Sequence, residues 1–345
     1  MPGATPDGPA TYLVTGGAGF IGSHLVDALL ARGDKVIVLD NLSTGRLSNL
    51  DSDRPRPNLR FVHGSVLDEL VVDELVHQCD VVVHLAAAVG VKLIVEQPLR
   101  SLTTNIRGSQ IVIEAAYRHR RTILLASSSE IYGKNSSGPL REDADRIIGS
   151  PAVVRWAYST AKAVDEILAN AYHAERGLPT IVARLFNTVG ARQSPAYGMV
   201  IPRLVRQALA GQPLSVYGTG AQTRCFAHVA DVVAALVALL STPAAIGQTV
   251  NIGSSEEISI RRLADLVIEA AGSPSRVELI PYERAYGAGF EDMDRRVPDT
   301  GRLRALTGWA PRHALRDVLA DAIAEARAEA AADTAAAPAG QLIRS

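Results

Sequence analysis

The chain has 345 residues, of which 47% are hydrophobic and 21% are charged, and its formal net charge is −1. This composition is that of a globular protein and excludes wholesale disorder, while the near-neutral charge gives no electrostatic reason to expect nucleic acid or an anionic membrane as a partner. Two cysteines, Cys79 and Cys225, are too few for a disulfide framework or a metal site.

Short apolar runs rich in β-branched residues alternate with helical stretches over the first half of the chain. We expect strands at 12–15, 35–40, 59–63, 80–85, 122–127 and 180–185, and helices at 21–31, 99–118 and 158–176. Strands that are apolar on both faces and alternate with helices predict an α/β fold, the doubly wound parallel Rossmann sheet with helices on both sides.

This alternation stops near residue 190, where several Pro and Gly residues interrupt a mixed region. We therefore predict a nucleotide-binding Rossmann domain over 10–190, with returning segments near 225–252, and a smaller substrate-binding lobe mainly over 191–325. The Ala-rich segment 326–345 is expected to be a flexible tail. The Pro- and Gly-rich start lacks the pattern of a signal peptide, and the apolar stretch 229–240 is too short to span a bilayer, so we expect a cytoplasmic protein.

A glycine-rich turn, Thr-Gly-Gly-Ala-Gly-Phe-Ile-Gly at 15–22, follows the first strand and opens the first helix. In such a turn Gly16 permits the tight bend, Gly19 lets the backbone approach a pyrophosphate, and Gly22 lets the helix pack closely on the strand. The helix N-terminus adds N–H donors and partial positive charge for the phosphates. Taken alone, the same pattern also fits an ordinary strand-to-helix turn.

Asp40 ends the second strand, 18 residues after Gly22. A carboxylate at this position can accept hydrogen bonds from both adenosine ribose hydroxyls and repels a 2′-phosphate, so it favours NAD over NADP, although Arg46 is near enough in sequence to weaken that preference. Ser65, after the third strand, is placed to contact the adenine edge. The alternative is that Asp40 is simply a solvated strand end.

Tyr158 and Lys162 lie four residues apart in a predicted helix and therefore share a face. An ammonium beside a phenol favours phenolate, so we expect the pKa of Tyr158 to be lowered, as a general base requires. The serines at 127–129 follow a strand whose carboxyl end should face the ligand crevice, where a hydroxyl can bind the same substrate oxygen. An isolated Tyr-x-x-x-Lys pair is more often a surface feature.

These motifs occur in the order and spacing typical of the extended short-chain dehydrogenase/reductases, and over 12–325 the chain resembles the nucleotide-sugar epimerases and decarboxylases of that family. Further matching segments are Asp40-Asn41, His-Leu-Ala-Ala at 84–87, Asn105, 127–133, 184–192, 216–218, Thr223-Arg224 and Arg-Val-Pro-Asp at 296–299. The resemblance implies that Tyr158 is the general base, that Ser128 rather than Ser129 is its helper, and that Lys162 also holds the nicotinamide ribose.

The resemblance also implies an NAD pocket and a UDP-sugar pocket, with no metal. The expected NAD-binding residues are Gly16, Gly19, Phe20, Ile21, Gly22, Asp40, Asn41, Ser43, Thr44, Gly45, Ser65, Val66, Leu85, Ala86, Ala87, Asn105, Tyr158, Lys162 and Leu185. The expected substrate-binding residues are Ser128, Ser129, Glu130, Asn187, Arg192, Val200, Val216, Tyr217, Arg224 and Arg296. Among them, Arg224 and Arg296 are expected to clamp the diphosphate with Asn187, and Val216 and Tyr217 to frame the uracil.

The reaction implied is transient oxidation of the sugar at C4 by bound NAD, through a 4-keto intermediate. Four-epimerases typically carry Tyr-x-x-(Ser/Ala)-Lys, as at 158–162, and a cation at Arg192 could pair with a C6 carboxylate. The sequence therefore favours interconversion of UDP-glucuronate and UDP-galacturonate. If Arg192 instead binds phosphate or a protein carboxylate, neutral UDP-glucose or its N-acetyl relative is the expected substrate.

Three other activities stay open. UDP-glucuronate decarboxylases share Ser128, Glu130 and the segments 186–192 and 222–224, but their tyrosine segment usually reads Tyr-Asp-Glu-Gly-Lys. Dehydratases place Asp-Glu after the helper hydroxyl, whereas this chain has Ser129-Glu130. A non-catalytic NAD-binding sensor would have no need to keep a base, its helper and a lysine together.

Relatives in this family usually form homodimers through two long helices, and the helices 99–118 and 158–176 are the expected pair. Whether the segment 193–200 closes over substrate is open at this stage.

Overall fold

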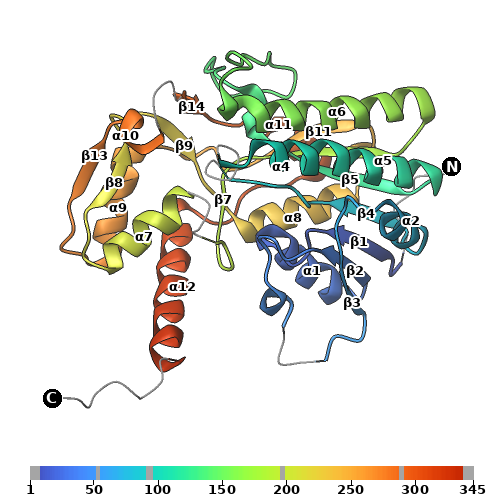
Figure 1. The fold of residues 1–345 in the computed structure, drawn as a ribbon, viewed down its shortest axis with the longest axis horizontal. Helices are drawn as coiled ribbons and strands as arrows, with labels where there is room; N and C mark the ends of the chain where they lie inside the picture. The colour runs from blue at the N-terminus through green and yellow to red at the C-terminus, as the bar shows by residue number, and fades with distance from the viewer. Residues whose placement is uncertain (1–7, 52–54, 91–95, 195–198, 287–290, 337–345) are drawn as a thin grey trace.

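The computed structural model describes residues 8–51, 55–90, 96–194, 199–286 and 291–336, which form a larger lobe around a central sheet and a smaller lobe beside it (Figure 1). Within the described residues, the large sheet has seven strands in the order β11-β6-β5-β4-β1-β2-β3, with every neighbouring pair parallel. Its strands are β1 (Thr11–Thr15), β2 (Lys35–Asp40), β3 (Leu59–His63), β4 (Val81–His84), β5 (Thr122–Ser128), β6 (Thr180–Leu185) and β11 (Gln248–Ile252). The predicted Rossmann sheet is confirmed.

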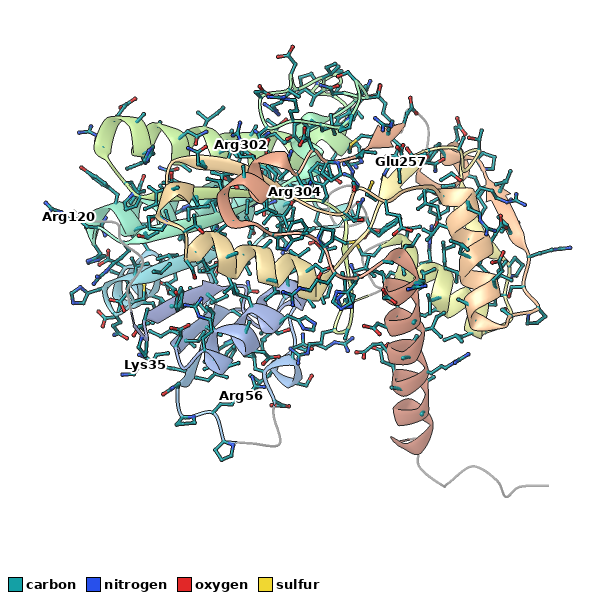
Figure 2. All side chains as sticks on the ribbon, turned by 180° about the vertical axis from the view of Figure 1, so that it is seen from behind. Lys35, Arg56, Arg120, Glu257, Arg302 and Arg304 are labelled. Atoms are coloured by element: carbon teal, nitrogen blue, oxygen red, sulfur yellow. The ribbon has the colours of Figure 1, made fainter. Side chains whose placement is uncertain are left out.

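Helices cover both faces of this sheet, as strands buried on both faces require. One face carries α1 (Phe20–Ala31), α8 (Val229–Leu240) and α11 (Gly301–Thr307); the other carries α2 (Glu69–His77), α5 (Gly108–Arg118) and α6 (Ala157–Arg176). Each fully buried Leu or Val between these layers contributes roughly 1.5–3 kcal/mol relative to its exposed state. Charged side chains such as Lys35 and Arg120 lie at the periphery instead (Figure 2).

The long helix expected at 99–118 is interrupted. It consists of α4 (Pro98–Leu102), a π-helical turn η2 (Thr103–Arg107) and α5. The wider π turn contains the buried Asn105, whose amide forms two hydrogen bonds with the backbone of Ala88, Ala88 N to Oδ1 at 2.7 Å and Nδ2 to Ala88 O at 3.1 Å. Such turns are frequently associated with functional sites.

The smaller lobe has its own apolar core, contributed mainly by α7, β8, α9 and α12. Its elements are α7 (Val200–Leu209), β8 (Leu214–Tyr217), β9 (Thr223–Cys225), β12 (Glu257–Ser259), α9 (Ile260–Ala271), β13 (Val277–Ile280), α10 (Tyr282–Tyr286), β14 (Arg295–Arg296) and α12 (Leu315–Ala336). The short strands β7 (Thr188–Val189) and β10 (Ala227–His228) pair where the chain passes between the lobes. The shortest helical turns are η1 (Leu47–Leu50), η3 (Ser129–Tyr132), η4 (Val154–Trp156) and η6 (Pro243–Ala245).

The expected flexible tail from 326 needs correction, because α12 continues to Ala336. The helix is held by side-chain contacts as well as by its Ala-rich composition: Arg206 pairs with Glu329 at 3.2 Å, and Ile323 packs into the small-lobe core. Residues 337–345 lie outside the described residues, as do 195–198 of the segment considered for closure over substrate. No helix in the described part of the chain is sufficiently long and apolar to cross a membrane.

Candidate active site

The glycine-rich turn has the geometry that a dinucleotide phosphate needs. Gly16 has φ +74°, and a Cβ there would lie 2.8 Å from the amide nitrogen of Ala86. A Cβ on Gly22 would overlap the carbonyl oxygen of Gly16. Helix α1 begins at Phe20 after Gly19, which provides no side-chain cap, so the first N–H groups of the helix are available to a phosphate.

Asp40 is fastened to this turn. Its Oδ2 accepts a hydrogen bond from Ala18 N at 3.0 Å, and its Oδ1 accepts one from Leu42 N at 2.8 Å. Gly45 lies so close that a Cβ there would be 3.1 Å from Asp40 Oδ2. The carboxylate is therefore fixed at the end of β2, and each oxygen keeps a further lone pair that can accept a hydrogen bond.

The other expected NAD-binding residues lie in the connections that follow the parallel strands. Asn41, Ser43 and Thr44 follow β2, Ser65 and Val66 follow β3, Leu85, Ala86 and Ala87 follow β4, and Leu185 ends β6. The carboxyl ends of parallel strands share one sheet edge, which is where such folds bind their ligands. The residues expected to bind NAD therefore lie along that edge, and Asn105 is hydrogen-bonded to Ala88 in the segment after β4.

Tyr158 and Ser128 meet at this edge. Tyr158 lies in the first turn of α6, Ser128 is the last residue of β5, and their side chains share a hydrogen bond. Ser128 Oγ also accepts a hydrogen bond from Glu130 N at 3.2 Å, which fixes the hydroxyl. Ser129 is buried beside them. The geometry matches a base with a helper hydroxyl.

The expected lowering of the Tyr158 pKa is corrected by the structure. Burial raises the pKa of Tyr158 above its usual range, and the negative charges of Glu130 and Asp165 raise it further, against the hydrogen bond from Ser128 that lowers it. Lys162 does not reverse this because its ammonium is paired with Asp165, Nζ to Oδ2 at 3.1 Å. The chain by itself therefore holds Tyr158 as a neutral phenol.

Lys162 is positioned by a buried chain of polar groups. Asp165 also has a side-chain hydrogen bond with Ser109, and Ser109 Oγ lies 3.1 Å from His84 Nε2. His84 Nδ1 in turn lies 2.7 Å from Thr15 Oγ1 at the end of β1. Burial, together with the charge of Lys162, lowers the pKa of His84 to about 3, so this histidine is neutral. This series of polar contacts connects helix α6 to β1 and β4.

A second buried network fastens α6 to the sheet. Arg184 of β6 donates from Nε and Nη2 to Glu166 of α6, at 2.9 and 2.7 Å, and from Nη1 to Tyr132 Oη at 2.8 Å. Ser127 Oγ donates to Glu166 at 2.5 Å. Burial alone would lower the pKa of Arg184, but the hydrogen bond and charge of Glu166 raise it. Glu166 lies one turn after Lys162, so this network holds the catalytic face of α6 against β5 and β6.

Three arginines surround Glu130. Arg155 forms a two-pronged ion pair with it, Nη1 to Oε2 at 2.6 Å and Nη2 to Oε1 at 3.0 Å, and Arg296 Nη1 lies 3.7 Å from Oε1. Arg296 Nη2 donates to Asn187 Oδ1 at 2.6 Å. Arg224 is level with Arg296 in the β9–β14 pair, and its charge also acts on Glu130. The structure thus brings together the expected Glu130, Asn187, Arg224 and Arg296.

This cluster is suited to an anion. Its three guanidinium groups face two carboxylates, Glu130 and Asp292, which pairs with Arg224 at 3.2 Å. Burial and the neighbouring charge of Arg224 lower the pKa of Arg296 to about 10, against the opposing effect of Glu130. Among the described residues, the buried Nε of Arg296 has no hydrogen-bond partner. An incoming phosphate or carboxylate oxygen would offset the repulsion between Arg224 and Arg296 and would accept a hydrogen bond from the Arg296 Nε.

The residues expected to frame a uracil lie on the smaller lobe. Val216 is buried in β8, Tyr217 ends that strand, and Val200 begins α7. The guanidinium carbon of Arg203 lies 4.1 Å from the centre of the Tyr217 ring, a cation–π contact that fixes the ring.

Arg192 pairs outside the cluster around Glu130, so these contacts do not support the expectation that it meets a sugar carboxylate. Its Nη1 lies 2.8 Å from Asp27 Oδ2 on α1, and its backbone N donates to Glu325 Oε1 of α12 at 3.3 Å. Its φ of +66° turns the chain at this point. The guanidinium is therefore used to join α1 to the segment after β7, in line with the alternative that it binds a protein carboxylate.

Arg155 and Asp165 contribute to the site but were not predicted from the sequence. Each is three residues from a predicted catalytic residue, Arg155 before Tyr158 and Asp165 after Lys162. That spacing places side chains on neighbouring positions of one helix face and could have identified both.

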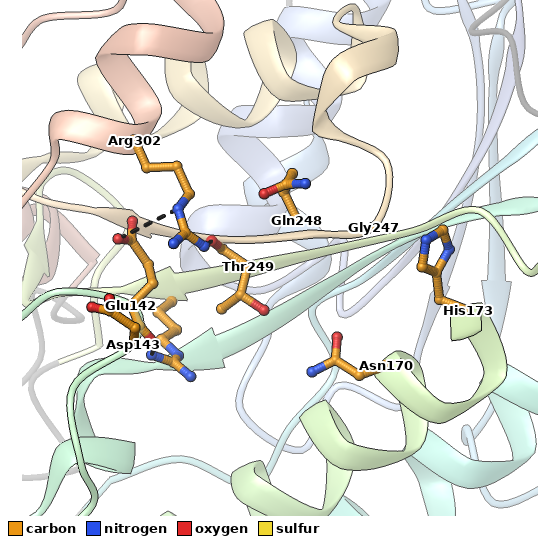
Figure 3. Close-up of a pocket in the computed structure, with 9 residues that line it drawn as sticks. Glu142, Asp143, Asn170, His173, Gly247, Gln248, Thr249 and Arg302 are labelled. Atoms are coloured by element: carbon orange, nitrogen blue, oxygen red, sulfur yellow. Dashed lines mark hydrogen bonds and ion pairs between the residues drawn. The ribbon is translucent and has the colours of Figure 1, made fainter. Parts of the chain in front are cut away.

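A separate pocket of about 390 Å³ opens on the Arg184 network (Figure 3). It is lined by Glu142, Asp143, Asn170, His173, Arg184, Gly247, Gln248, Thr249 and Arg302. Its cations are already engaged: Arg302 lies 3.7 Å from Glu142, and Arg184 pairs with Glu166. It contains no residue predicted to bind NAD or substrate, and we assign it no role in the reaction.

Comparison with known proteins agrees with this geometry. Residues 12–253 match the model of the NAD dependent epimerase/dehydratase family. UDP-N-acetyl-alpha-D-glucosaminuronate decarboxylase of Bacillus cytotoxicus is 39% identical over 300 residues, covering 87% of this chain and 92% of that protein. UDP-glucuronic acid decarboxylase 1 of Danio rerio is 36% identical over 299 residues, covering 87% of this chain and 68% of that protein.

Solved structures show the same likeness. UDP-glucuronic acid 4-epimerase of Bacillus cereus, in complex with UDP-glucuronic acid and NAD, superposes with a TM-score of 0.83 at 28% identity, covering 92% of this chain and 99% of that one. UDP-glucose 4-epimerase of Thermotoga maritima also has a TM-score of 0.83, at 30% identity, covering 93% of this chain and 99% of that one. The chain therefore belongs to the NAD-dependent epimerase/dehydratase family of extended short-chain dehydrogenase/reductases, and its cofactor is NAD.

Proposed function

We propose that this protein is an NAD-dependent decarboxylase of a UDP-linked hexuronic acid. The observation that carries the proposal is Glu130, whose side chain is only 14% exposed and is paired with Arg155 and Arg296 near Tyr158. The two decarboxylases described above, similar over most of this chain, support the same reaction. The reaction expected first from the sequence, C4 epimerisation of UDP-glucuronate, shares its oxidation step and is the second candidate.

The first part of the proposed mechanism is common to both candidates. Bound NAD supplies a hydride acceptor for C4, later returns the hydride, and brings a positive nicotinamide ring that favours Tyr158 phenolate. Tyr158 takes the proton of the 4-hydroxyl, and Ser128 orients that oxygen by a hydrogen bond. Lys162, held by Asp165, orients the nicotinamide ribose. The sugar becomes a 4-ketone with its carboxylate on the adjacent C5, which makes it a β-keto acid.

Decarboxylation then requires loss of the C5–C6 bond. The bonding electron pair moves toward C4 and gives an enolate, whose oxygen is stabilised by the Tyr158 phenol and Ser128, and neutral CO₂ leaves. The negative charge of Glu130 nearby disfavours retention of a second carboxylate. One proton from solvent is added at C5, and Tyr158 returns its proton to O4 as C4 is reduced. Each turnover thus releases one CO₂ and consumes one proton.

Two observations favour the second candidate, C4 epimerisation. The tyrosine segment reads Tyr158-Ser-Thr-Ala-Lys162, the form typical of four-epimerases, and the fold superposes on a UDP-glucuronic acid 4-epimerase over almost its full length. In that case, the keto acid turns in the pocket and keeps C6. The Arg296 cluster would then hold the carboxylate in place instead of favouring its loss.

Product analysis tests the proposal. The full chain with NAD is incubated separately with UDP-glucuronate, UDP-N-acetylglucosaminuronate and UDP-glucose, and the products are followed by NMR together with CO₂ release. We expect a UDP-pentose or its N-acetyl analogue with stoichiometric CO₂, and a loss of roughly 10²–10⁴-fold in kcat for Tyr158→Phe. A C4 epimer that keeps its carboxylate would reject decarboxylation in favour of epimerisation. Turnover of UDP-glucose alone would indicate a neutral substrate, and inertness toward every nucleotide sugar with NAD bound would indicate a sensor.

We also propose that the protein is a homodimer through α5 and α6. Ile167 is 63% exposed on α6, Tyr117 is 40% exposed on α5, and Leu99 on the adjoining α4 is 80% exposed. Light scattering with Ile167→Glu as the disrupting variant tests this, with a wild-type monomer as the contrary result.

A further inference from the structure

Arg155 occupies an unusual position for a structural arginine. It lies in the 3-10 turn η4, three residues before Tyr158, and both of its terminal nitrogens contact Glu130, at 2.6 and 3.0 Å. The two side chains are 4% and 14% exposed. A two-pronged pair fixes the direction of the carboxylate as well as its distance, because the guanidinium is planar.

The turn that carries Arg155 is itself anchored. Trp156 is buried, and its Nε1 donates to Glu291 Oε2 at 2.7 Å. Lys134 pairs with the same carboxylate at 2.8 Å. Because only two residues separate Arg155 from Tyr158, the guanidinium and the catalytic phenol are placed by one rigid turn.

Several charges face Glu130, and Arg155 is the nearest. Arg296 lies 3.7 Å away, Arg224 acts from β9, where it also pairs with Asp292, and Tyr158 is near enough for the charge of Glu130 to raise its pKa. Burial raises the pKa of Glu130, but the charge and hydrogen bonds of Arg155, together with the smaller effects of Arg296 and Arg224, outweigh it, so the pKa is lowered. If Arg155 is removed, the arginines that remain lie farther from the Glu130 carboxylate than Arg155 did.

We propose that Arg155 is a positioning residue that holds Glu130 as a fixed carboxylate beside Tyr158 and thereby directs the keto-acid intermediate toward loss of CO₂. The proposal rests on the proposed function, because it assigns Glu130 the role of disfavouring a second carboxylate in the pocket. Arg155 touches neither the reacting atoms nor the cofactor in this assignment. It acts through Glu130.

The distinguishing readout is a pH profile. In Arg155→Met, Glu130 loses its nearest cation and takes up a proton at neutral pH, so kcat for CO₂ release should fall on the order of tenfold at pH 6 and recover as the pH is raised toward 8.5. The KM for UDP-glucuronate should change less than kcat. Arg155→Lys keeps the charge and should retain the wild-type profile with partial activity. Arg141→Met, which removes an exposed ion pair with Asp143, is the matched control and should behave as wild type.

A second readout does not depend on activity. In Arg155→Met the folded-state pKa of Glu130 is raised above its unfolded value, so the folded protein binds the extra proton, and stability is lost as the pH rises. As the pH rises from 5 to 8, the Tm of Arg155→Met should therefore decrease more than that of the double variant Glu130→Gln/Arg155→Met, which lacks the titrating carboxyl group. Identical pH dependence of Tm in the single and double variants would overturn the proposal, as would a uniform loss of kcat at all pH values.

Failure of the proposed decarboxylation can be distinguished from failure of the proposed role of Arg155. If the wild-type protein yields a C4 epimer without CO₂, decarboxylation is rejected, and with it the direction that we assign to Glu130. The Tm comparison would still decide whether Arg155 keeps Glu130 ionised. If wild type releases CO₂ but the kcat of Arg155→Met does not fall at pH 6 and recover toward pH 8.5, the proposed function stands and the role of Arg155 is rejected.

Discussion

Replacement of Arg184 by Met should destabilise the fold more than any other single loss of an ion pair described above. Arg184 makes two short contacts with Glu166 and donates from Nη1 to Tyr132 Oη at 2.8 Å and to Glu142 O at 2.9 Å. The side chains of Arg184 and Glu166 are 11% and 5% exposed, so Glu166 would stay largely out of water when the cation is lost. Without Arg184, the one hydrogen bond that Glu166 keeps within the described part of the chain is the one from Ser127.

Breaking a buried pair from one side costs about 3–5 kcal/mol, because the remaining charge is uncompensated. We therefore expect Arg184→Met to lower the free energy of unfolding by about 4 kcal/mol, measured by urea denaturation. The double variant Arg184→Met/Glu166→Leu should recover most of this, since neither charge remains. Arg262→Met, which breaks an exposed pair with Glu269, should cost less than about 1 kcal/mol. A double variant as unstable as the single one, or a single variant no worse than Arg262→Met, would refute the reasoning.

Three further outcomes are expected. Gly22→Ala should abolish NAD binding in calorimetry, because its methyl group overlaps the phosphate turn, whereas Gly8→Ala meets nothing within 4 Å and should bind normally; retained affinity in the first would contradict the turn geometry. His84 is neutral when folded, with a pKa of about 3, so the unfolded chain binds more protons below about pH 6.5 and stability falls as the pH is lowered. Between pH 6.5 and 5, His84 should lower the free energy of unfolding by about 2 kcal/mol, and the His84→Asn variant should not show this loss. An equal dependence of the unfolding free energy on pH in both proteins would exclude this effect of His84. Arg192→Ala should change the calorimetric affinities for UDP-glucuronate and UDP-glucose equally, because Arg192 pairs with Asp27; a loss of affinity confined to UDP-glucuronate would show that Arg192 contacts the sugar carboxylate.

Those parts of the site that depend on neighbours in sequence could be predicted from the sequence. The glycine turn at 16–22, Asp40 at the end of β2 and the Tyr158–Lys162 spacing are local patterns, and each lies where it was expected. The strand and helix boundaries of the Rossmann half follow from hydrophobic periodicity, which is also local. The π turn at 103–107 and the continuation of α12 to Ala336 were not predicted, because tertiary contacts stabilise both.

Charge partners could not be predicted in the same way. Glu130, Arg155, Arg224 and Arg296 come from four segments that meet only in the folded chain, and the direction of the Tyr158 pKa depends on burial among them. Arg192 had the residue type expected for a carboxylate site, yet Asp27 is its partner.

The sequence by itself determined the nucleotide-binding fold, the cofactor turn and the catalytic pair, because backbone conformation and helix periodicity are set by residues near one another. Only the tertiary structure decided which arginines surround Glu130 and that burial raises the pKa of Tyr158. Electrostatic energies depend on distance through space and on exclusion of water, and neither is determined by separation along the chain.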